Sequence, residues 1–97
     1  MDSLHFEWDE NKAASNQVKH GISFEEAKSV FSDSLGRLMI DPDHPEGEER
    51  FVLMGMSSQI RLLIVCHCER NAGSIRIISA RKADKFERKQ YEEKGYA

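Results

Sequence analysis

Residues 61–81 read RLLIVCHCERNAGSIRIISAR, and this stretch decides the fold. It predicts two apolar strands, Ile60–Cys68 and Ser74–Ala80, separated by the short polar segment at residues 70–73. A connection of this length favours an antiparallel hairpin. A charged helix is expected directly after the second strand, so the hairpin and the helix together define the C-terminal third of the protein.

Side-chain alternation divides the first of these strands into two faces. One face is wholly apolar and is expected to pack against the helices; it holds Leu62, Ile64, Cys66 and Cys68. The other face is polar at both ends and carries Arg61, Leu63, Val65, His67 and Glu69. A row of arginine, histidine and glutamate on that second face can bind a phosphate and transfer protons without a metal ion.

The rest of the chain predicts the element order β-α-α-β-β-β-β-α. Capping residues mark the helices, with Asp9 before the first helix, Gly21 after it, and Ser23 with Glu26 as a capping box. The expected segments are strands at 4–8, 35–40 and 50–56, helices at 10–20, 24–32 and 84–94, and a turn-rich loop at 41–47. We therefore predict an α+β fold with a mostly antiparallel sheet and helices packed on one face.

Length and composition exclude several classes of protein. A chain of 97 residues has room for one domain, expected to span residues 1–97. No apolar run approaches the roughly 20 residues of a membrane span, and the first residues lack a signal-peptide pattern, so we expect a cytoplasmic protein. Cys66 and Cys68 have neither redox-motif nor zinc-site spacing, and reduced thiols are expected.

Charge is distributed unevenly along the chain. Residues 1–49 hold 4 Lys/Arg and 12 Asp/Glu, a net charge of −8, whereas residues 50–97 hold 10 and 5, a net charge of +5. The basic half contains the arginines of the hairpin. Because the planar guanidinium group binds phosphate oxygens in pairs, this cluster indicates a phosphodiester ligand, and RNA or DNA chemistry becomes the first hypothesis.

Arg76 and Arg81 have an unfavourable spacing for a shared site. In a regular strand Arg76 projects with Ile78, while Arg81 projects to the other side, so the two arginines point apart unless a bulge intervenes. Arg81 lies where the strand meets the final helix and can reach a ligand at the edge of the sheet. We rank it above Arg76 as a site residue.

Several short motifs, taken in order, resemble the BrnT toxin family of type II toxin–antitoxin modules. They are Phe6-Glu7-Trp8-Asp9, Asn16 with Lys19-His20-Gly21, Phe24-Glu25-Glu26-Ala27, Glu48-Glu49-Arg50, Arg61-Leu62-Leu63, Glu69-Arg70, Ile75 to Arg81, Glu87-Arg88 and Tyr91-Glu92. The resemblance implies a ribonuclease toxin with a RelE-like fold. It also implies a ribbon-helix-helix antitoxin that neutralises the toxin, in a complex that represses its own operon.

The resemblance and the charge pattern together give a set of site residues. The expected catalytic residues are Arg61, His67, Glu69, Arg81 and Tyr91, and the expected substrate-binding residues are Lys19, His20, Arg50, Arg70 and Arg76. Glu69 or His67 would act as general base on the 2′-hydroxyl. Arg61 and Arg81 would stabilise the charged phosphate, and Lys19, His20 or Tyr91 would protonate the leaving oxygen or hold the backbone.

These residues also have structural alternatives. Lys19 and His20 suit the last turn of a helix, where cations complement the helix dipole, and Tyr91 suits the core. A second functional hypothesis is a non-catalytic module that binds an antitoxin and regulates transcription. No metal or cofactor is expected, since the histidine spacings match no metal motif. DNA would be reached only through the antitoxin.

Overall fold

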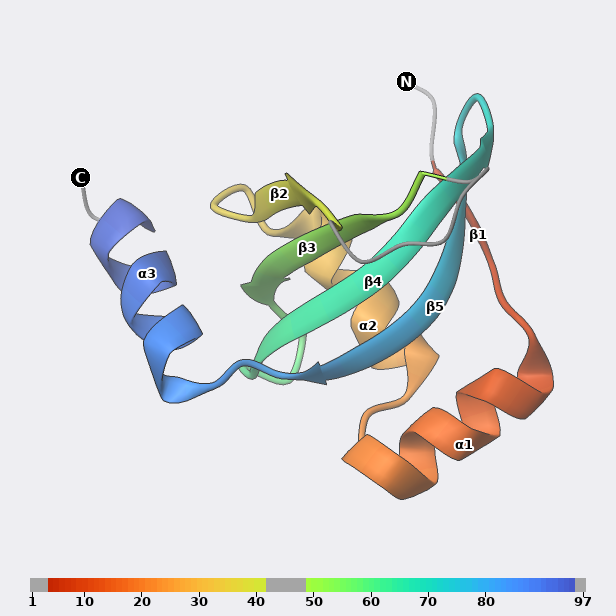
Figure 1. Cartoon of the computed structure of the whole chain (residues 1–97), viewed down its shortest axis with the longest axis horizontal. Helices are drawn as coiled ribbons and strands as arrows, with labels where there is room; N and C mark the ends of the chain where they lie inside the picture. Colours follow the sequence, from red (N-terminus) through yellow and green to blue (C-terminus); the bar gives the residue numbers. More distant parts are fainter. Residues whose placement is uncertain (1–3, 42–48, 96–97) are drawn as a thin grey trace.

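A five-stranded sheet forms the centre of the fold, in the strand order β1-β5-β4-β3-β2. The computed structural model describes residues 4–41 and 49–95 (Figure 1). Its strands are β1 (His5–Glu7), β2 (Arg37–Ile40), β3 (Phe51–Met56), β4 (Leu62–Asn71) and β5 (Ser74–Lys82). Its helices are α1 (Glu10–His20), α2 (Phe24–Ser29), the short 3-10 helix η1 (Val30–Ser32) and α3 (Lys85–Gly95). The predicted element order and the α+β class are confirmed.

Strand pairing is mostly antiparallel, as expected. β2, β3, β4 and β5 pair with their neighbours in antiparallel fashion, and β1 pairs with β5 in parallel. The predicted hairpin between β4 and β5 turns at Ala72 and Gly73, whose φ of 84° favours glycine. The turn-rich loop predicted at 41–47 lies, apart from Asp41, outside the described residues.

The helices begin and end at the residues that the sequence marks. Asp9 accepts hydrogen bonds from the backbone N–H groups of Asn11 and Lys12, at 2.7 and 3.2 Å, and Gly21 ends α1 with a φ of 72°. The Ser23 hydroxyl accepts a bond from the Glu26 N–H at 3.0 Å. These local bonds explain why the helix boundaries could be predicted well.

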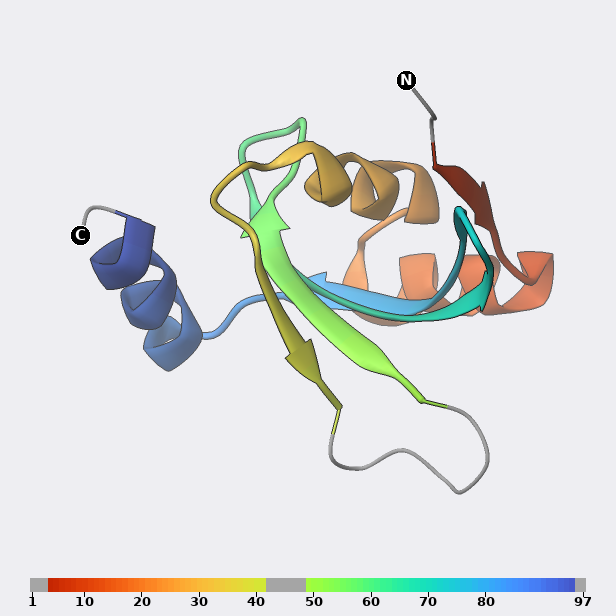
Figure 2. The same ribbon diagram turned by 90° about the horizontal axis from the view of Figure 1, so that it is seen from above.

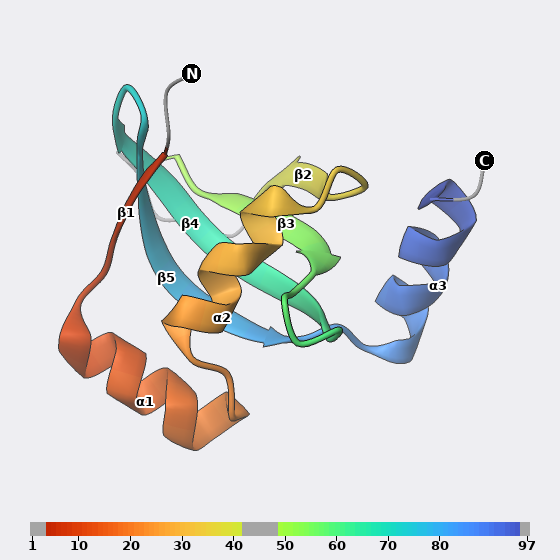
Figure 3. The same cartoon turned by 180° about the vertical axis from the view of Figure 1, so that it is seen from behind.

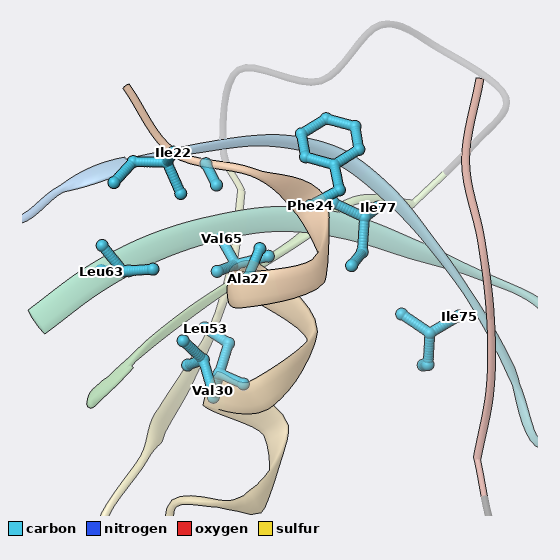
Figure 4. Packing of buried hydrophobic residues seen from close by; sticks show 10 residues of the cluster. Ile22, Phe24, Ala27, Val30, Leu53, Leu63, Val65, Ile75 and Ile77 are labelled. Atoms are coloured by element: carbon cyan, nitrogen blue, oxygen red, sulfur yellow. The ribbon is translucent and has the colours of Figure 1, made fainter. Parts of the chain in front are cut away.

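The main core lies between α2 and one face of the sheet. Phe24, Ala27 and Val30 pack on Leu53, Leu63, Val65, Ile75 and Ile77 (Figure 4). Figure 3 shows α2 crossing this face of the sheet. The predicted choice of faces is therefore wrong: the helix-packed face carries Leu63, Val65 and His67 instead of Leu62, Ile64, Cys66 and Cys68. Alternation could not decide, because both faces of β4 are largely apolar and buried.

The opposite face of the sheet has a smaller apolar cluster, and α3 contributes to it. Tyr91 packs there with Met54, Leu62 and Ile64. Figure 2 shows α3 beyond the end of the sheet, away from α1 and α2. The expectation that helices pack on one face thus describes α1 and α2, since Ala13 of α1 also packs against the main core, whereas α3 contacts the other cluster through Tyr91.

Asn16 connects α1 to the sheet. Its side-chain amide donates to the carbonyl oxygens of Ile22 and Ala80, both at 2.9 Å, and its amide oxygen accepts from the Ala80 N–H at 3.0 Å. The side chain is buried, and all three bonds satisfy backbone groups that would otherwise lack partners. Asn16 therefore fixes the C-terminal half of α1 beside the end of β5.

Among the helices of residues 4–41 and 49–95, none is long and apolar enough to cross a membrane.

Candidate functional site

The structure divides the ten predicted site residues between the two ends of the central strands. We call one group the basic end; it lies where β4 begins and β5 finishes, low in Figure 1, and comprises Lys19, His20, Arg61, Arg81 and the neighbouring Lys82. Tyr91 lies beside it. We call the other group the hairpin end; it lies near the β4–β5 turn and comprises Arg50, His67, Glu69, Arg70 and Arg76.

The predicted row of Arg61, His67 and Glu69 does not form one site. The three side chains share a side of β4 by alternation, but this side is packed against α2. Arg61 and His67 are six residues apart, about 20 Å along an extended strand. A single phosphate cannot contact both, so the two ends must be considered separately.

At the basic end, Arg61 is held by Glu26 of α2. The Arg61 Nε donates to Glu26 Oε2 at 2.9 Å, and Nη2 donates to Oε1 of the same carboxylate and to the Gly21 carbonyl at 3.5 Å. The Ser57 hydroxyl also donates to Glu26 Oε2, at 2.6 Å. These bonds join the end of α1, the start of α2 and the turn before β4 at one point.

This ion pair has an inner and an outer half. The Glu26 carboxylate is 2% exposed, whereas the Arg61 side chain is 32% exposed. Hydrogen bonding to Arg61 lowers the pKa of Glu26 against the opposing effect of burial, and the bond to Glu26 raises the pKa of Arg61. Glu26 therefore stays ionised and orients a guanidinium group whose outer part can reach solvent or a ligand.

Arg81 is held in a similar way by Glu87. Its Nη1 and Nη2 donate to Oε1 and Oε2 of the Glu87 carboxylate, both at 2.9 Å. Glu87 also accepts from the Asp84 N–H at 2.9 Å, and its own N–H donates to Asp84 Oδ1 at 2.7 Å. The capping box that starts α3 thus also positions Arg81, at the junction of strand and helix where it was predicted.

A bulge in β5 brings Arg76 and Arg81 to the same face. Cys66 pairs with Ser79 and His67 pairs with Ile77, so Ile78 is an extra residue in β5. Arg81 pairs with Ile64 and Arg76 with Cys68, two residues that lie on one side of β4. Both arginines therefore project from the face opposite α2, although they remain near different ends of β5.

The other residues of the basic end lie near the groups that Arg61 contacts, Gly21 and Glu26. Lys19 and His20 occupy the last turn of α1, directly before the Gly21 carbonyl that Arg61 contacts. Lys82 lies close enough for its charge to lower the pKa of Glu26. Cations in this turn also complement the α1 dipole, so the structural and functional interpretations of Lys19 and His20 are compatible.

Tyr91 lies in the core beside the basic end. The side chain is buried, and its hydroxyl donates to Asp33 Oδ2 at 2.6 Å. Asp33 also accepts from the backbone N–H groups of Met56 and Leu35, at 2.7 and 2.9 Å. This arrangement indicates that Tyr91 anchors α3 to the turn before β2.

At the hairpin end, His67 is enclosed by aromatic rings. It is 3% exposed, with the Phe31 ring edge-on at 4.8 Å and the Phe51 ring stacked at 6.0 Å between centroids. Its Nδ1 lies 3.2 Å from the Val65 carbonyl, and burial lowers the pKa of the imidazole. Such a histidine remains neutral in the folded protein, and Glu69 is exposed beside it.

The arginines of the hairpin end lie on the other side of the sheet or at its margin. Arg76 is half-buried and donates to Glu7 Oε2 of β1 at 3.1 Å. The Arg50 carbonyl accepts from the Asp41 N–H at 2.9 Å, and the Arg50 charge opposes the rise that burial causes in the pKa of Cys66. Arg70 is exposed near the hairpin turn.

Sequence reasoning missed the carboxylates that hold the arginines. The sequence indicates a capping role for Glu26 and places Glu87 in a family motif, whereas in the structure Glu26 turns towards Arg61 and Ser57. Glu7 reaches Arg76 only because β1 pairs in parallel with β5. No local sequence signal identifies these pairs, because Glu87 bonds back to its cap residue and also holds Arg81, whereas Glu26 bonds to Arg61 and Ser57.

No group of three or more His, Cys, Asp and Glu side chains is placed to hold a metal ion within residues 4–41 and 49–95.

Comparisons with known proteins agree with this fold. The family described as "Ribonuclease toxin, BrnT, of type II toxin-antitoxin system" matches residues 8–87. The crystal structure of the Brucella abortus ribonuclease toxin BrnT is similar, with a TM-score of 0.63 and 21% identity over 86% of this chain and 100% of that one. At that identity the likeness shows the fold alone. No curated protein matches significantly.

Proposed function

This chain belongs to the BrnT family of ribonuclease toxins of type II toxin–antitoxin systems, and from that premise we propose that it cleaves RNA without a metal ion at the basic end. The observation that carries the proposal is the pair of arginines, Arg61 and Arg81, each fixed by a glutamate at the same end of β4 and β5. A guanidinium group that is already oriented loses little entropy when it binds a phosphate.

The positive charge at the basic end supports phosphodiester binding. Arg61, Arg81 and Lys82 lie near the edge where the sheet ends, and Lys19 and His20 approach it from α1. Arg61 and Arg81 project to opposite faces of the sheet, so a phosphate that contacts both must lie at the end of the strands, between the two guanidinium groups. The side chains of both are partly exposed, at 32% and 43%.

The proposed reaction is attack by the 2′-hydroxyl on the adjacent phosphorus. The bond from O2′ to phosphorus forms, the bond from phosphorus to O5′ breaks, and a 2′,3′-cyclic phosphate and a 5′-hydroxyl result. Arg61 and Arg81 stabilise the charge on the five-coordinate phosphorus. His20 accepts the hydroxyl proton, and the Lys19 ammonium group protonates the departing O5′.

Three of the predicted catalytic residues take no part in proton transfer in this proposal: His67, Glu69 and Tyr91. His67 is enclosed by aromatic rings at the hairpin end, and the Tyr91 hydroxyl is bonded to Asp33. Glu69 is near His67 and about eight residues of extended strand from Arg61, roughly 26 Å. The proposal therefore assigns the roles of general base and general acid to His20 and Lys19, in the last turn of α1.

A type II toxin has an antitoxin as its partner. We further propose that this antitoxin is a ribbon-helix-helix protein, that it neutralises the toxin, and that the complex binds operator DNA through the antitoxin. The acidic N-terminal half, with a net charge of −8, is consistent with a toxin that does not bind DNA itself. RNA would contact only the basic end.

The test is cleavage of a labelled RNA by the purified chain, free of antitoxin, in a buffer with EDTA. Wild-type protein should cleave and leave cyclic-phosphate ends. Arg81→Ala should be slower by about 100-fold, the usual effect of removing one stabilising donor. Arg88→Ala removes an exposed arginine of α3 that pairs with Glu92 at 3.7 Å, and should cleave like wild type.

Each outcome has a distinct meaning. Cleavage that stops in EDTA and returns with a divalent cation would refute metal independence. Equal loss in Arg81→Ala and Arg88→Ala would remove the basic end from the site. Absence of cleavage by wild type, on free RNA and in a translating extract, would favour the non-catalytic module that binds an antitoxin.

A further inference from the structure

Exposed apolar side chains gather at the hairpin end, on the face that α2 only partly covers. Leu38 and Ile40 of β2 are 61% and 60% exposed, and they lie beside Leu53 and Phe51 of β3. Phe31 of η1 borders this patch on the side of α2, where its ring contacts His67. We call the surface formed by Phe31, Leu38, Ile40 and Phe51 the apolar shelf.

The shelf contains a pocket of about 300 Å³. Its walls are Phe31, Leu38, Phe51 and Leu53, its base includes His67, and Glu69 stands at its margin. Glu69 is the one charged residue among those that line it. The pocket has room for a large apolar side chain, and the carboxylate beside it favours a neighbouring cation.

The shelf borders a strand whose outer edge pairs with no other strand in the described part of the sheet. β2 is the last strand in the sheet order, and three of its four residues, Leu38, Met39 and Ile40, are exposed and apolar. Edge strands are usually protected by charged residues, bulges or a covering element, because bare edges promote aggregation. An apolar edge next to an apolar pocket therefore indicates a surface that a partner protein covers.

We infer that the apolar shelf is where the antitoxin anchors, by inserting a large apolar side chain that is followed or preceded by a lysine or arginine. This inference rests on the proposed function, since membership of a type II toxin family supplies the partner. The anchor lies at the hairpin end, remote from the basic end, so by itself it provides affinity for the antitoxin. Inhibition requires the antitoxin to extend further, as far as the basic end.

A second copy of the chain fits the shelf less well than an antitoxin does. In a twofold dimer the same patch on both subunits meets, so the two Glu69 carboxylates would approach each other within one apolar interface. Like charges brought into a desolvated contact are unfavourable. A partner with the opposite charge beside its apolar anchor has no such conflict.

The test is binding of the purified antitoxin to the full-length chain, measured by titration calorimetry. Leu38→Asp and Ile40→Asp each place a carboxylate on the shelf at an exposed position, and each should weaken binding by about 30-fold or more. Val18→Asp makes the same change at an 88% exposed residue of α1 and should leave binding within about twofold. Glu69→Lys should also weaken binding.

RNA cleavage by the free variants separates this inference from the proposed function. Leu38→Asp and Ile40→Asp should cleave RNA like wild type, and cells that produce them should no longer be rescued by the antitoxin. Unchanged binding of both variants would overturn the inference, whatever the cleavage result. The inference would also be overturned if the toxin forms a dimer without antitoxin and Leu38→Asp dissociates it. The shelf would then bind a second copy of the chain.

Discussion

The basic end and the hairpin end contain the same types of side chain in different surroundings. At the basic end Arg61 and Arg81 are each oriented by a carboxylate and remain partly exposed. At the hairpin end His67 is buried among aromatic rings, and Arg76 makes one bond to its carboxylate partner, whereas Arg61 and Arg81 each make two. Chemistry at a phosphodiester needs oriented charge that a ligand can reach, so the surroundings, and not the residue types, distinguish the two ends.

The comparison also separates two kinds of surface on one small sheet. The basic end is suited to a polyanion, and the apolar shelf at the other end is suited to a protein. A toxin that is controlled by an antitoxin needs both surfaces. Under the two proposals above, their separation along the strands allows the apolar shelf to change without altering Arg61 and Arg81.

The largest expected effect in this comparison comes from Glu26→Gln. The change removes the charge that orients Arg61 and leaves a buried amide facing Ser57, and we expect a loss of about 2 kcal/mol in the free energy of unfolding. Cleavage should slow as well, because Arg61 loses its orientation. Urea unfolding and RNA cleavage measure the two effects.

Glu25→Gln is the matched control for Glu26→Gln. Its side chain is 71% exposed and its carboxylate forms an ion pair with Lys28 at 3.5 Å, so stability should change by less than about 1 kcal/mol. If both variants lose the same stability and activity, the bond from Arg61 to the Glu26 carboxylate does not orient Arg61 for cleavage. The distinction between the basic end and the hairpin end would then be wrong.

An intermediate effect is expected from His67→Phe, in the pH dependence of stability. Because the pKa of His67 is lowered on folding, the unfolded chain binds a proton more readily, and stability falls as pH drops below the ordinary histidine range. Removing the imidazole should make the stability curve flatter between pH 8 and pH 5. RNA cleavage should stay within about twofold of wild type, as expected for a residue outside the reacting centre.

The same variant can contradict the assignment of the two ends. If His67→Phe folds but no longer cleaves RNA, His67 at the hairpin end takes part in proton transfer and the assignment to the basic end is wrong. An unchanged slope of stability against pH would show that His67 is not buried as a neutral group.

The smallest effect is expected from Arg76→Ala. Its bond to Glu7 joins two partly exposed side chains, which is worth at most about 1 kcal/mol. Cleavage should change by less than about threefold if RNA contacts the basic end only. A decrease as large as that of Arg81→Ala would extend the RNA site along β5 to the hairpin end, and thermal unfolding would exclude a folding defect.

Local chemistry explains which parts of this protein were predictable. The helices begin at Asp9 and Ser23 and turn at Gly21 because short-range hydrogen bonds and one positive φ act there regardless of the rest of the fold. The strands predicted at 50–56, 60–68 and 74–80 are found at 51–56, 62–71 and 74–82, because apolar runs separated by short turns mark them, although β4 begins two residues later and ends three residues later than predicted. The division into a single domain over residues 1–97 remains a prediction.

Local sequence could not predict which face of β4 packs against α2, or which site residues lie together. Both sides of β4 are apolar, so only the position of α2 decides that Leu63 and Val65 face the main core. Arg76 and Arg81 share a face only because the pairing of β4 with β5 contains an extra residue at Ile78. Neither fact can be obtained from a single strand.

The amino-acid sequence by itself determined the order of the elements, the starts of the helices and the family motifs, because these depend on neighbouring residues and on their order. Tertiary structure alone decided which charged residues have carboxylate partners. Arg61 meets Glu26 across 35 positions of the chain, and Arg76 meets Glu7 across 69. The first contact requires α2 to pack on the sheet and the second requires β1 to pair with β5, because the distance between the partners in space is set by the whole fold.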